Sequence, residues 1–474
     1  MDKVTLPPHV LIFPLPLQGP VNSMFKLAEL LCLSGFHITF LVTDHIHTRL
    51  LKYSNIQSRC DIYPRFRLET ISDGLPEDHP RSGSGLIELF ESLKTNKILF
   101  KDLLTSGKLN SDSRRPVTCI IANGTLGYTC DVANELGIPI LFVRTISACC
   151  LWVFFRLPKL IESGELPFSV NDLDTPIKSV LGMERFLRRR DLPTFCRSGN
   201  LSDPSLKLYL HESKEIPRAP GLIINSFDDL EGPILSQIRT FCPNLYTVGP
   251  LHSHLKYKLS GELSSSFTSS SSLWNEDSSC ITWLDSQPPN SVLYISFGSH
   301  AVMTKEQYTE LWYGLVNSGS HFLWAIRPDS LTSDSIEIPP ELSKDIDERG
   351  YIVEWAPQEE VLAHNAVGGF LTHSGWNSTL ESVIEGVPMI CWPVFLDQHV
   401  NSRFVGEVWK LGLDMKDTCD RIIIEKTVRE LMDSRKHEFR TSADQMAKLA
   451  KQCLMPGGSS YCNLERLIKD IQAM

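Results

Sequence analysis

Short apolar segments alternate with helix-like segments along the whole of this chain. In the first half, residues 9–13, 36–42 and 117–122 are mostly apolar, and helix-like patterns lie at residues 21–34 and 131–136. A strand that is apolar on both faces is typical of a parallel sheet that helices cover on both sides. The alternation therefore predicts an α/β fold built on a doubly wound parallel sheet.

A second α/β pattern follows a polar, serine-rich tract. The tract runs through residues 260–279 and is too polar to bury itself, so we expect a flexible surface loop there. After it come a strand at 292–297, a helix at 305–318 and a strand at 322–326. Two doubly wound units of this kind bind ligands at the carboxyl ends of their strands. The sequence thus predicts two Rossmann-like domains that face a central cleft.

Composition argues against several classes of partner. The chain has 474 residues, of which 42% are hydrophobic and 22% charged, as in an ordinary globular protein of two or three domains. A net charge of -10 argues against a nucleic acid or an anionic membrane as partner. The apolar run near the N-terminus is too short and too interrupted by proline for a membrane span or a signal peptide. The 13 cysteines lie mostly in apolar runs without metal-binding spacing, so we expect reduced thiols in a cytoplasmic protein and no metal. A monomer is also expected.

One strand–turn–helix segment has the features of an anion site. A buried strand at 369–372 leads through the small-residue turn 373–378 into a helix at 379–385. Free backbone N–H groups and the helix dipole favour an anion at such a helix start, and Gly375 allows a close backbone approach. A turn of this kind is by itself more often only a helix cap.

An aromatic residue and a carboxylate–amide pair flank this segment. Trp355 follows a short strand at 351–354 and opens a loop, where an exposed indole can stack on a flat base. Asp397 and Gln398 together accept and donate hydrogen bonds, as the recognition of adjacent sugar hydroxyls requires. A lone tryptophan is more often core, but the three features in one segment suit a nucleotide-activated sugar.

The stretch from Trp355 to Gln398 closely resembles the signature box of plant secondary-product UDP-glycosyltransferases. The resemblance extends over nearly the whole chain and implies the GT-B fold, with UDP-glucose as co-substrate and no other cofactor. It implies an acceptor-binding domain at residues 1–246 and a UDP-sugar-binding domain at residues 247–456. The last helix, within residues 457–474, is expected to pack back on the N-terminal domain.

The resemblance also implies a set of donor-binding residues, carried over position by position. The expected contacts to uracil and ribose are Trp355, Ala356, Gln358 and Glu381. The expected contacts to the diphosphate are His373, Asn377, Ser378, Gly298 and Ser299, and those to the sugar are Asp397, Gln398 and Thr145. Trp376 belongs to the same donor-binding set. A glutamine at position 398 resembles the glucose-preferring members of the family.

The catalytic pair of the family is missing. A histidine that removes the acceptor proton is expected where this chain has Pro20, and its aspartate partner is expected where the chain has Asn123. A positioned base contributes roughly 10²- to 10⁴-fold to such a reaction, and proline offers no proton acceptor. The catalytic residue is therefore unknown. Four nearby titratable residues are expected to be surface loop residues: Asp44, His45, His47 and His79.

Three functions fit this combination of an intact donor box and an absent base. The first is glucosyl transfer to a small terpenoid whose hydroxyl or carboxyl group is acidic enough to need little base. Residues 66–81 and 147–152 resemble the branch that glucosylates iridoids such as 7-deoxyloganetic acid, which favours this reading. The second is a repurposed scaffold whose cleft binds a small metabolite and promotes its cyclisation, isomerisation or an elimination. The third is a binding protein without catalysis.

Overall fold

The computed structural model describes the chain in six segments: residues 7–81, 85–110, 114–259, 272–328, 330 and 339–474. The chain divides into two compact units, and each is discontinuous in sequence. Unit 1 comprises residues 1–158, 202–274 and 452–474, whereas unit 2 comprises residues 159–201 and 275–451.

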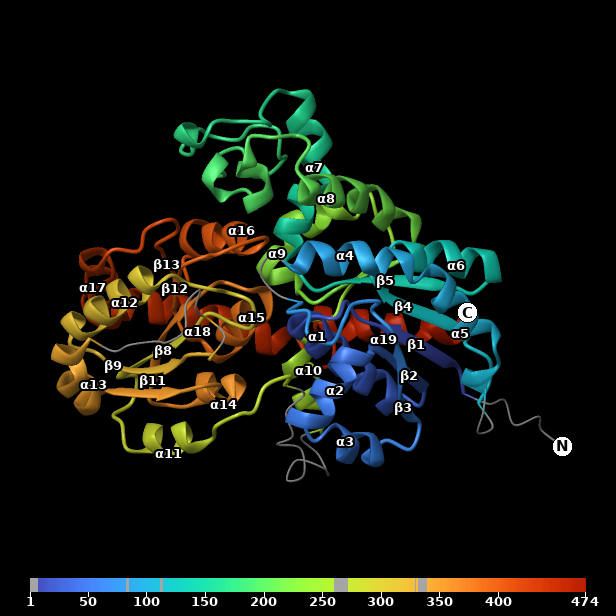
Figure 1. Ribbon diagram of the computed structural model, residues 1–474, viewed down its shortest axis with the longest axis horizontal. Helices are drawn as coiled ribbons and strands as arrows, with labels where there is room; N and C mark the ends of the chain where they lie inside the picture. Colours follow the sequence, from blue (N-terminus) through green and yellow to red (C-terminus); the bar gives the residue numbers. More distant parts are fainter. Residues whose placement is uncertain (1–6, 82–84, 111–113, 260–271, 329, 331–338) are drawn as a thin grey trace. The chain divides into compact units, whose positions relative to one another are not determined.

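Unit 1 is built on a parallel sheet of seven strands among the described residues, in the order β3-β2-β1-β4-β5-β6-β7 (Figure 1). The strand order reverses between β1 and β4, the type of position where open α/β sheets bind ligands. The strands are β1 (His9–Phe13), β2 (His37–Thr43), β3 (Phe66–Ile71), β4 (Cys119–Asn123), β5 (Ile140–Arg144), β6 (Leu222–Ile224) and β7 (Leu245–Thr247).

Helices cover both faces of this sheet. On β1, Val10 and Ile12 join a core cluster with α1, α10 and α19, whereas Phe13 stacks on Phe100 of α5 at 5.6 Å between ring centroids. This two-sided burial explains why the strands are apolar throughout. The helices of unit 1 are α1 (Gln18–Leu33), α2 (Asp44–Tyr53), α3 (Ile56–Ile62), α4 (Gly85–Thr95), α5 (Lys97–Thr105), α6 (Tyr128–Leu136), the first part of α7 (Ala148–Glu162), α8 (Pro204–Glu215), α9 (Asp228–Ile238), α10 (Leu251–Leu259) and α19 (Ser459–Ala473).

The first helix begins earlier than its apolar pattern predicts. The predicted start is Val21, but α1 begins at Gln18 and includes Pro20 as its third residue. A proline fits in the first turn because the N–H groups there have no partner within the helix. The regular ladder starts directly after it, with Val21 N donating to Leu17 O at 3.0 Å.

The C-terminal helix completes unit 1. The last helix, α19, lies against β7 of the sheet of unit 1. Tyr246 donates through its hydroxyl to Asp470 at 2.6 Å, and Asn463 donates to Thr247 Oγ1 at 2.9 Å. The unit therefore needs residues from both ends of the chain.

Unit 2 contains a second parallel sheet, of six strands among the described residues, in the order β10-β9-β8-β11-β12-β13. The two sheets confirm the predicted fold class of two doubly wound α/β units. The strands of unit 2 are β8 (Val292–Ser296), β9 (His321–Ala325), β10 (Gly350–Val353), β11 (Val367–Thr372), β12 (Met389–Cys391) and β13 (Gly412–Asp414).

The helix that follows β8 begins and ends at the residues that the sequence predicted. It spans Lys305–Ser318 and starts with a capping box between Thr304 and Gln307. On its buried face Trp312 packs against Trp324 of β9, with ring centroids 4.4 Å apart. The helices of unit 2 are the end of α7, α11 (Ser279–Asp285), α12 (Lys305–Ser318), α13 (Ser343–Arg349), α14 (Gln358–Ala363), α15 (Trp376–Glu385), α16 (Gln398–Arg403), α17 (Arg421–Arg429) and most of α18 (Lys436–Cys453).

The units divide the chain elsewhere than at the expected boundary of residues 246 and 247. Unit 1 continues to Trp274, and residues 159–201 belong to unit 2. Of the expected flexible loop at 260–279, residues 260–271 lie outside the described residues. Residues 272–278 form no helix or strand, but the segment is not wholly at the surface, because Leu273 is buried and accepts hydrogen bonds from Arg49 through its carbonyl. Helix α11 begins at Ser279.

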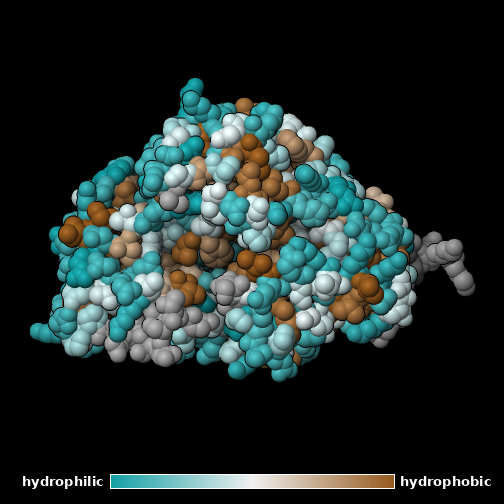
Figure 2. Space-filling model, turned by 45° about the horizontal axis from the view of Figure 1, so that its top comes forward, coloured by the Kyte–Doolittle hydropathy of each residue, from teal (hydrophilic) through white to brown (hydrophobic). Residues whose placement is uncertain are grey.

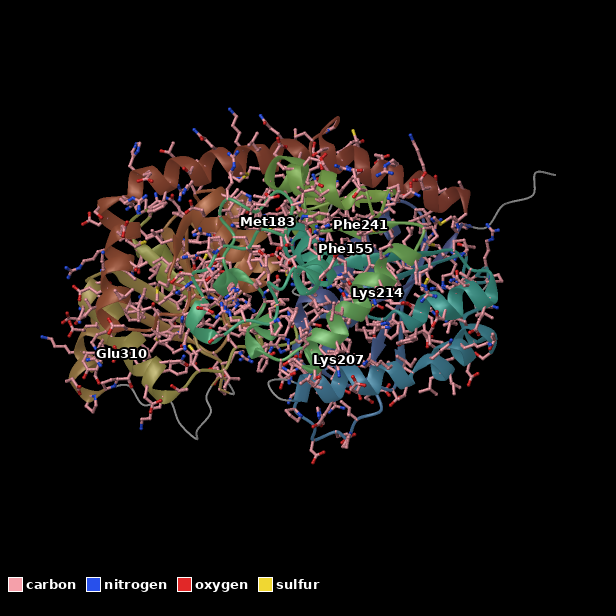
Figure 3. The ribbon with its side chains drawn as sticks, turned by 90° about the horizontal axis from the view of Figure 1, so that it is seen from above. Phe155, Met183, Lys207, Lys214, Phe241 and Glu310 are labelled. Carbon is pink, nitrogen blue, oxygen red and sulfur yellow. The ribbon has the colours of Figure 1, made fainter. Side chains whose placement is uncertain are left out.

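On the face shown in Figure 2, hydrophilic residues are interspersed with smaller groups of hydrophobic ones. One aromatic group near the surface belongs to unit 1, where Phe155 and Phe241 stack with their ring centroids 5.4 Å apart (Figure 3). No helix in the described segments is both long and apolar enough to cross a membrane.

Candidate functional site

A glutamine at the start of α14, itself a predicted donor-site residue, bonds to two others. Gln358 donates through Nε2 to Ser378 Oγ at 2.9 Å and to Glu381 Oε2 at 2.6 Å. Its Oε1 accepts a hydrogen bond from the Tyr294 hydroxyl at 3.3 Å. The two acceptors on one side and the donor on the other fix the orientation of the amide. The structure thus brings together residues that are about twenty positions apart in the sequence.

Trp355 and Ala356 lie in the short segment between β10 and α14. The Trp355 side chain is half-buried, and its carbonyl accepts a hydrogen bond from Asp277 N at 2.8 Å. Ala356 is buried at 3% exposure. The tryptophan is therefore neither a core residue nor a fully exposed one.

Two glycines form a cradle around the His373 imidazole. A Cβ atom added to Gly298 would lie 2.6 Å from His373 Nε2, and one added to Gly375 would lie 2.4 Å from the same atom. Real Cβ contacts are not this short, so neither position accepts another residue without moving the ring. Gly298 also has a φ of +69°, which favours glycine. The sequence pattern predicted the role of Gly375 in backbone approach, but not that both glycines contact one histidine.

Burial controls the charge of His373. It lowers the pKa of the imidazole to about 4, and the nearby His300 and Arg327 act in the same direction. At neutral pH the ring is uncharged, so it can offer a phosphate oxygen one N–H donor but no full positive charge. Attraction for an anion must then come mainly from backbone N–H groups at the start of α15.

Hydrogen bonds to two side chains, those of Thr372 and Asn401, fix the backbone of the turn after β11. Ser374 has a φ of 63°, and its N–H donates to Thr372 Oγ1 at 3.2 Å. Asn401 donates through Nδ2 to Ser374 O at 2.9 Å and to Asp397 Oδ2 at 2.8 Å. Asn401 therefore links the predicted diphosphate turn to the first predicted sugar ligand. It lies one helical turn after Asp397, and that spacing is the sequence signal that could have identified it.

The side-chain oxygen of Gln398 is occupied by backbone hydrogen bonds. Its Oε1 accepts hydrogen bonds from Val394 N at 2.8 Å and from Phe395 N at 3.0 Å. Two backbone donors require an oxygen at that position, so the amide NH₂ is the group left for a sugar hydroxyl. Of the predicted pair of Asp397 and Gln398, the glutamine can therefore offer a sugar hydroxyl the donor, and the carboxylate the acceptor.

A buried arginine holds the loop that carries Gly298 and Ser299. Arg327 is 4% exposed and donates to Ser299 O at 2.5 Å and to Ala301 O at 2.7 Å. The sequence offered no signal for this role, because a single arginine after a strand is usually exposed. Trp376 and Asn377 lie in the first turn of α15, which begins at Trp376 and not at Thr379 as the sequence pattern predicted.

The remaining predicted sugar contact and the two anomalous positions belong to unit 1. Thr145 follows β5 directly and is half-buried. Asn123 ends β4, and its Oδ1 accepts a hydrogen bond from Thr125 N at 3.1 Å, so that the side chain closes a turn. Pro20 lies in the first turn of α1.

All four titratable residues near these positions were expected in loops, but three of them lie in a helix. Asp44, His45 and His47 lie in the first turn of α2, because the Thr43 hydroxyl caps that helix through Ile46 N. Burial lowers the pKa of His45, so its imidazole is uncharged at neutral pH. The fourth residue, His79, lies 2.9 Å from a carboxylate oxygen of Glu88. Among the described residues, no group of three or more His, Cys, Asp or Glu side chains could hold a metal ion.

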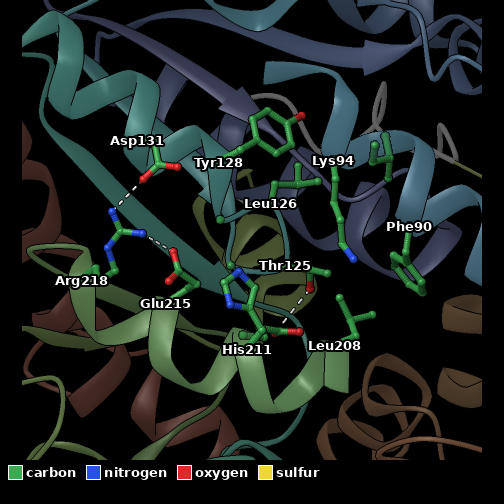
Figure 4. Close-up of a pocket in the computed structure, with 14 residues that line it drawn as sticks. Phe90, Lys94, Thr125, Leu126, Tyr128, Asp131, Leu208, His211, Glu215 and Arg218 are labelled. Carbon is green, nitrogen blue, oxygen red and sulfur yellow. Dashed lines mark hydrogen bonds and ion pairs between the residues drawn. The ribbon is translucent and has the colours of Figure 1, made fainter. Parts of the chain in front are cut away.

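Unit 1 also contains a cavity of about 310 Å³ beside the carboxyl end of β4 (Figure 4). Its apolar wall is formed mainly by Phe90, Leu93 and Leu208. Lys94 of α4 and His211 of α8 extend from opposite helices toward the turn that contains Thr125. The cavity thus combines apolar surface with a few polar groups, which is the usual composition of a small-molecule site.

A buried ion pair supports the floor of this cavity. Arg144 pairs with Glu212 and donates to Thr125 Oγ1 at 2.7 Å, and the Thr125 hydroxyl lies 3.4 Å from Glu212 Oε1. Burial raises the pKa of Glu212, although Arg144 opposes this shift. Sequence reasoning missed the cavity because its walls come from α4, the β4–α6 turn and α8, which are far apart in the chain.

Known sequences place the chain in a family. The sequence model described as "UDP-glucoronosyl and UDP-glucosyl transferase" matches residues 246–439. The chain is 56% identical over 477 residues to a 7-deoxyloganetic acid glucosyl transferase of Catharanthus roseus, with 100% of this chain and 99% of that protein covered. It is 40% identical to the (R)-mandelonitrile beta-glucosyltransferase of Prunus dulcis, with coverage of 98% and 97%.

Solved structures agree with the fold. Os79 from O. sativa, crystallised in complex with UDP, matches with a TM-score of 0.80 at 26% identity, covering 98% of this chain and 100% of that one. An anthocyanidin 3-O-glucosyltransferase in complex with UDP matches with a TM-score of 0.83 at 23% identity over 98% of this chain and 99% of that one, a likeness that bears on the fold alone. The predicted family is thereby confirmed: the chain belongs to the plant UDP-glycosyltransferases and has their GT-B fold.

Proposed function

We propose that this protein transfers glucose from UDP-glucose to a small iridoid-like terpenoid through an acidic hydroxyl or a carboxylate. The observation that carries the proposal is the predicted donor site of unit 2. There Gln358 bonds to Ser378 and Glu381, and two glycines lie against the His373 ring. The 56% identity to a 7-deoxyloganetic acid glucosyl transferase supports the acceptor class.

Each part of UDP-glucose has a chemically suited partner in unit 2. The uracil ring stacks on Trp355, and the ribose hydroxyls bind Glu381, which also accepts a hydrogen bond from the Gln358 amide. The diphosphate lies on the turn that begins at His373. The glucose hydroxyls bind Asp397 and the NH₂ group of Gln398, because the Gln398 oxygen is already occupied.

The acceptor binds in the cavity beside β4. Phe90, Leu93 and Leu208 would contact its apolar skeleton, and Lys94 and His211 its polar groups. The cavity lies at the carboxyl end of β4, next to the reversal in strand order where α/β sheets bind their ligands.

The chemistry is displacement at the anomeric carbon with inversion. The acceptor oxygen forms the new bond to that carbon while the bond to the UDP oxygen breaks, and UDP leaves as an anion that the turn at His373 stabilises. A carboxylate attacks already ionised, and an acidic hydroxyl loses its proton to water more readily than an alcohol does. A protein base at Pro20 is then unnecessary, and Asn123 is free to serve as the turn residue that its contact with Thr125 makes it.

The absent base also favours one alternative. A scaffold that had lost glycosyl transfer would have no need of a residue at position 20 that accepts a proton. Its cavity would instead promote cyclisation, isomerisation or elimination of a small metabolite, with the donor site retained for structural reasons.

One experiment separates these functions. UDP and UDP-glucose binding is measured by calorimetry, and products are analysed with matched terpenoid acids, hemiacetals and alcohols. Wild-type protein is expected to glucosylate the acidic acceptors and not the alcohols. The double substitution Pro20→His with Asn123→Asp should raise transfer to alcohols by up to about 10²- to 10⁴-fold and leave acidic acceptors nearly unchanged. An equal gain on both acceptor classes would refute base-independent transfer, and a reaction that proceeds without UDP-glucose would establish the repurposed scaffold.

A second experiment tests the acceptor cavity. Leu208→Trp fills it from α8, and the KM for the acceptor should rise while the affinity for UDP stays the same. Lys207→Trp is the matched control, since this exposed neighbour on α8 (Figure 3) adds the same side chain outside the lining. Equal kinetics in the two variants would remove the cavity from the acceptor site.

A further inference from the structure

The helix that opens with the sugar-site residues is fixed in its first turn by a buried lysine. Lys416 is 3% exposed and donates through Nζ to the carbonyl oxygen of His399 at 3.1 Å. The same Nζ lies 2.7 Å from Asp191 Oδ1 and 3.1 Å from Asp414 Oδ2. Since His399 follows Gln398 directly, this ammonium group holds the backbone beside a predicted sugar ligand.

The segment that supplies Asp191 holds the other end of the same helix. Asp191 is fully buried and also accepts from Arg188, while Arg403 Nε lies 3.5 Å from its second oxygen. Arg403, the last residue of α16, donates to Phe186 O at 2.9 Å. The rings of Phe186 and Phe404 meet edge to face at 5.2 Å. Both ends of α16 are therefore fastened to residues 186–191.

The contacts of α16 reach the sugar site but not the uracil site. Asp397 is tied to the helix through Asn401, and Gln398 is its first residue. Gln358 and Glu381, in contrast, lie on α14 and α15 and bond to each other. A small movement of α16 would displace the sugar ligands and leave the ligands of the uracil and ribose in place.

We propose that the Lys416–Asp191 pair is a positioning device that sets the sugar preference of the donor site. The inference rests on the proposed function, because it takes Asp397 and Gln398 as the ligands of glucose. A buried ion pair adds little net stability over an apolar pair of the same size, so stability alone gives it no clear purpose. What two opposed charges do provide is a fixed distance, here between residues 186–191 and the start of α16.

The test removes both charges of the pair and leaves the net charge of the protein unchanged, in the double variant Lys416→Met with Asp191→Asn. The dissociation constants of UDP, UDP-glucose and UDP-galactose are measured by calorimetry, and folding is checked by thermal unfolding. The preference for UDP-glucose over UDP-galactose should fall roughly threefold to tenfold, the effect of misplacing one hydrogen bond. UDP binding should weaken less than UDP-glucose binding, because α16 begins at the sugar ligands and contacts the diphosphate turn through the bond from Asn401 to Ser374 O. Lys416→Arg keeps the charge and should retain most of the preference even if the double variant folds poorly.

Glu310→Gln is the matched control. It removes an ion pair of unit 2 with Arg421 at 2.5 Å, which joins α12 to α17 and does not involve α16 (Figure 3). An unchanged sugar preference in the double variant, or an equal loss of UDP and UDP-glucose binding, would overturn the inference. Wild-type protein that binds the two UDP-sugars equally would refute the proposed preference itself, and this inference with it.

Discussion

The cradle of two glycines around His373 allows a sharp test of the donor site. In Gly298→Ala the new methyl group would lie 2.6 Å from His373 Cε1 and Nε2, so the ring must move. If the displaced ring loses its hydrogen bond to a charged phosphate, about 1.5–3 kcal/mol of binding free energy is lost. The affinity for UDP should then fall roughly tenfold to a hundredfold. Calorimetric titration with UDP measures the change.

Backbone strain must be separated from this clash. Gly298 has a φ of +69°, so alanine there also costs about 1–2 kcal/mol of folding free energy. Gly319 has a φ of +76°, and its nearest neighbour to an added Cβ is Arg349 Nη1 at 3.8 Å. Gly319→Ala therefore carries the same strain without a clash, and it should lower the melting temperature similarly while leaving UDP affinity unchanged.

A double-mutant cycle identifies the residue that transmits the effect. In a His373→Ala background the ring is gone, so Gly298→Ala should cause no further loss of UDP affinity. If the two losses simply add, or if Gly319→Ala weakens UDP as much as Gly298→Ala does, the contact with His373 is not what holds the diphosphate.

Three further predictions concern binding and stability. Trp355→Ala should weaken UDP binding roughly tenfold to a hundredfold in calorimetry, because stacking on a base is worth about 1–3 kcal/mol, and an unchanged constant would exclude the uracil contact. Asn401→Leu should weaken UDP-glucose more than UDP, since Asn401 supports both Asp397 and the turn at Ser374; equal effects on the two ligands would contradict this. Burial lowers the pKa of His9 to about 4, so its neutral form stabilises the fold above pH 6.5, and that stability is lost as the pH falls toward 4. In urea unfolding, His9→Gln should reduce the loss of stability over this range by about 3 kcal/mol. Part of the loss should remain, because burial also lowers the pKa of His373 to about 4.

Local patterns predicted the elements whose neighbours in sequence determine them. The strand at 9–13 and the helix at 305–318 lie where their apolar spacing and capping residues place them. The helix at α1 was predicted three residues too late, because Pro20 reads as a helix breaker although a first turn tolerates it. Strands of three residues, such as β6, are too short to show any periodicity.

In the candidate site, too, the local structure could be predicted from the sequence and the tertiary contacts could not. The turn from His373 to Ser378 is contiguous, so its strand–turn–helix form could be predicted from the sequence. The bond from Gln358 to Glu381 depends on how α14 packs on α15, and the contact of Gly298 with His373 depends on the pairing of β8 with β11. Such contacts are set by tertiary packing, which a single sequence does not encode in any local signal.

The discontinuity of the two units has a consequence for synthesis of the chain on the ribosome. The chain passes between units after Pro158, Leu201, Trp274 and Lys451. Unit 2 has all of its residues once Lys451 has emerged, but unit 1, whose first strand is made at the outset, still lacks α19 against β7. The unit that is begun first is therefore finished last. Until Asp470 reaches Tyr246, the apolar face that α19 covers must remain unburied, and chain termination or truncation before that point would leave it exposed.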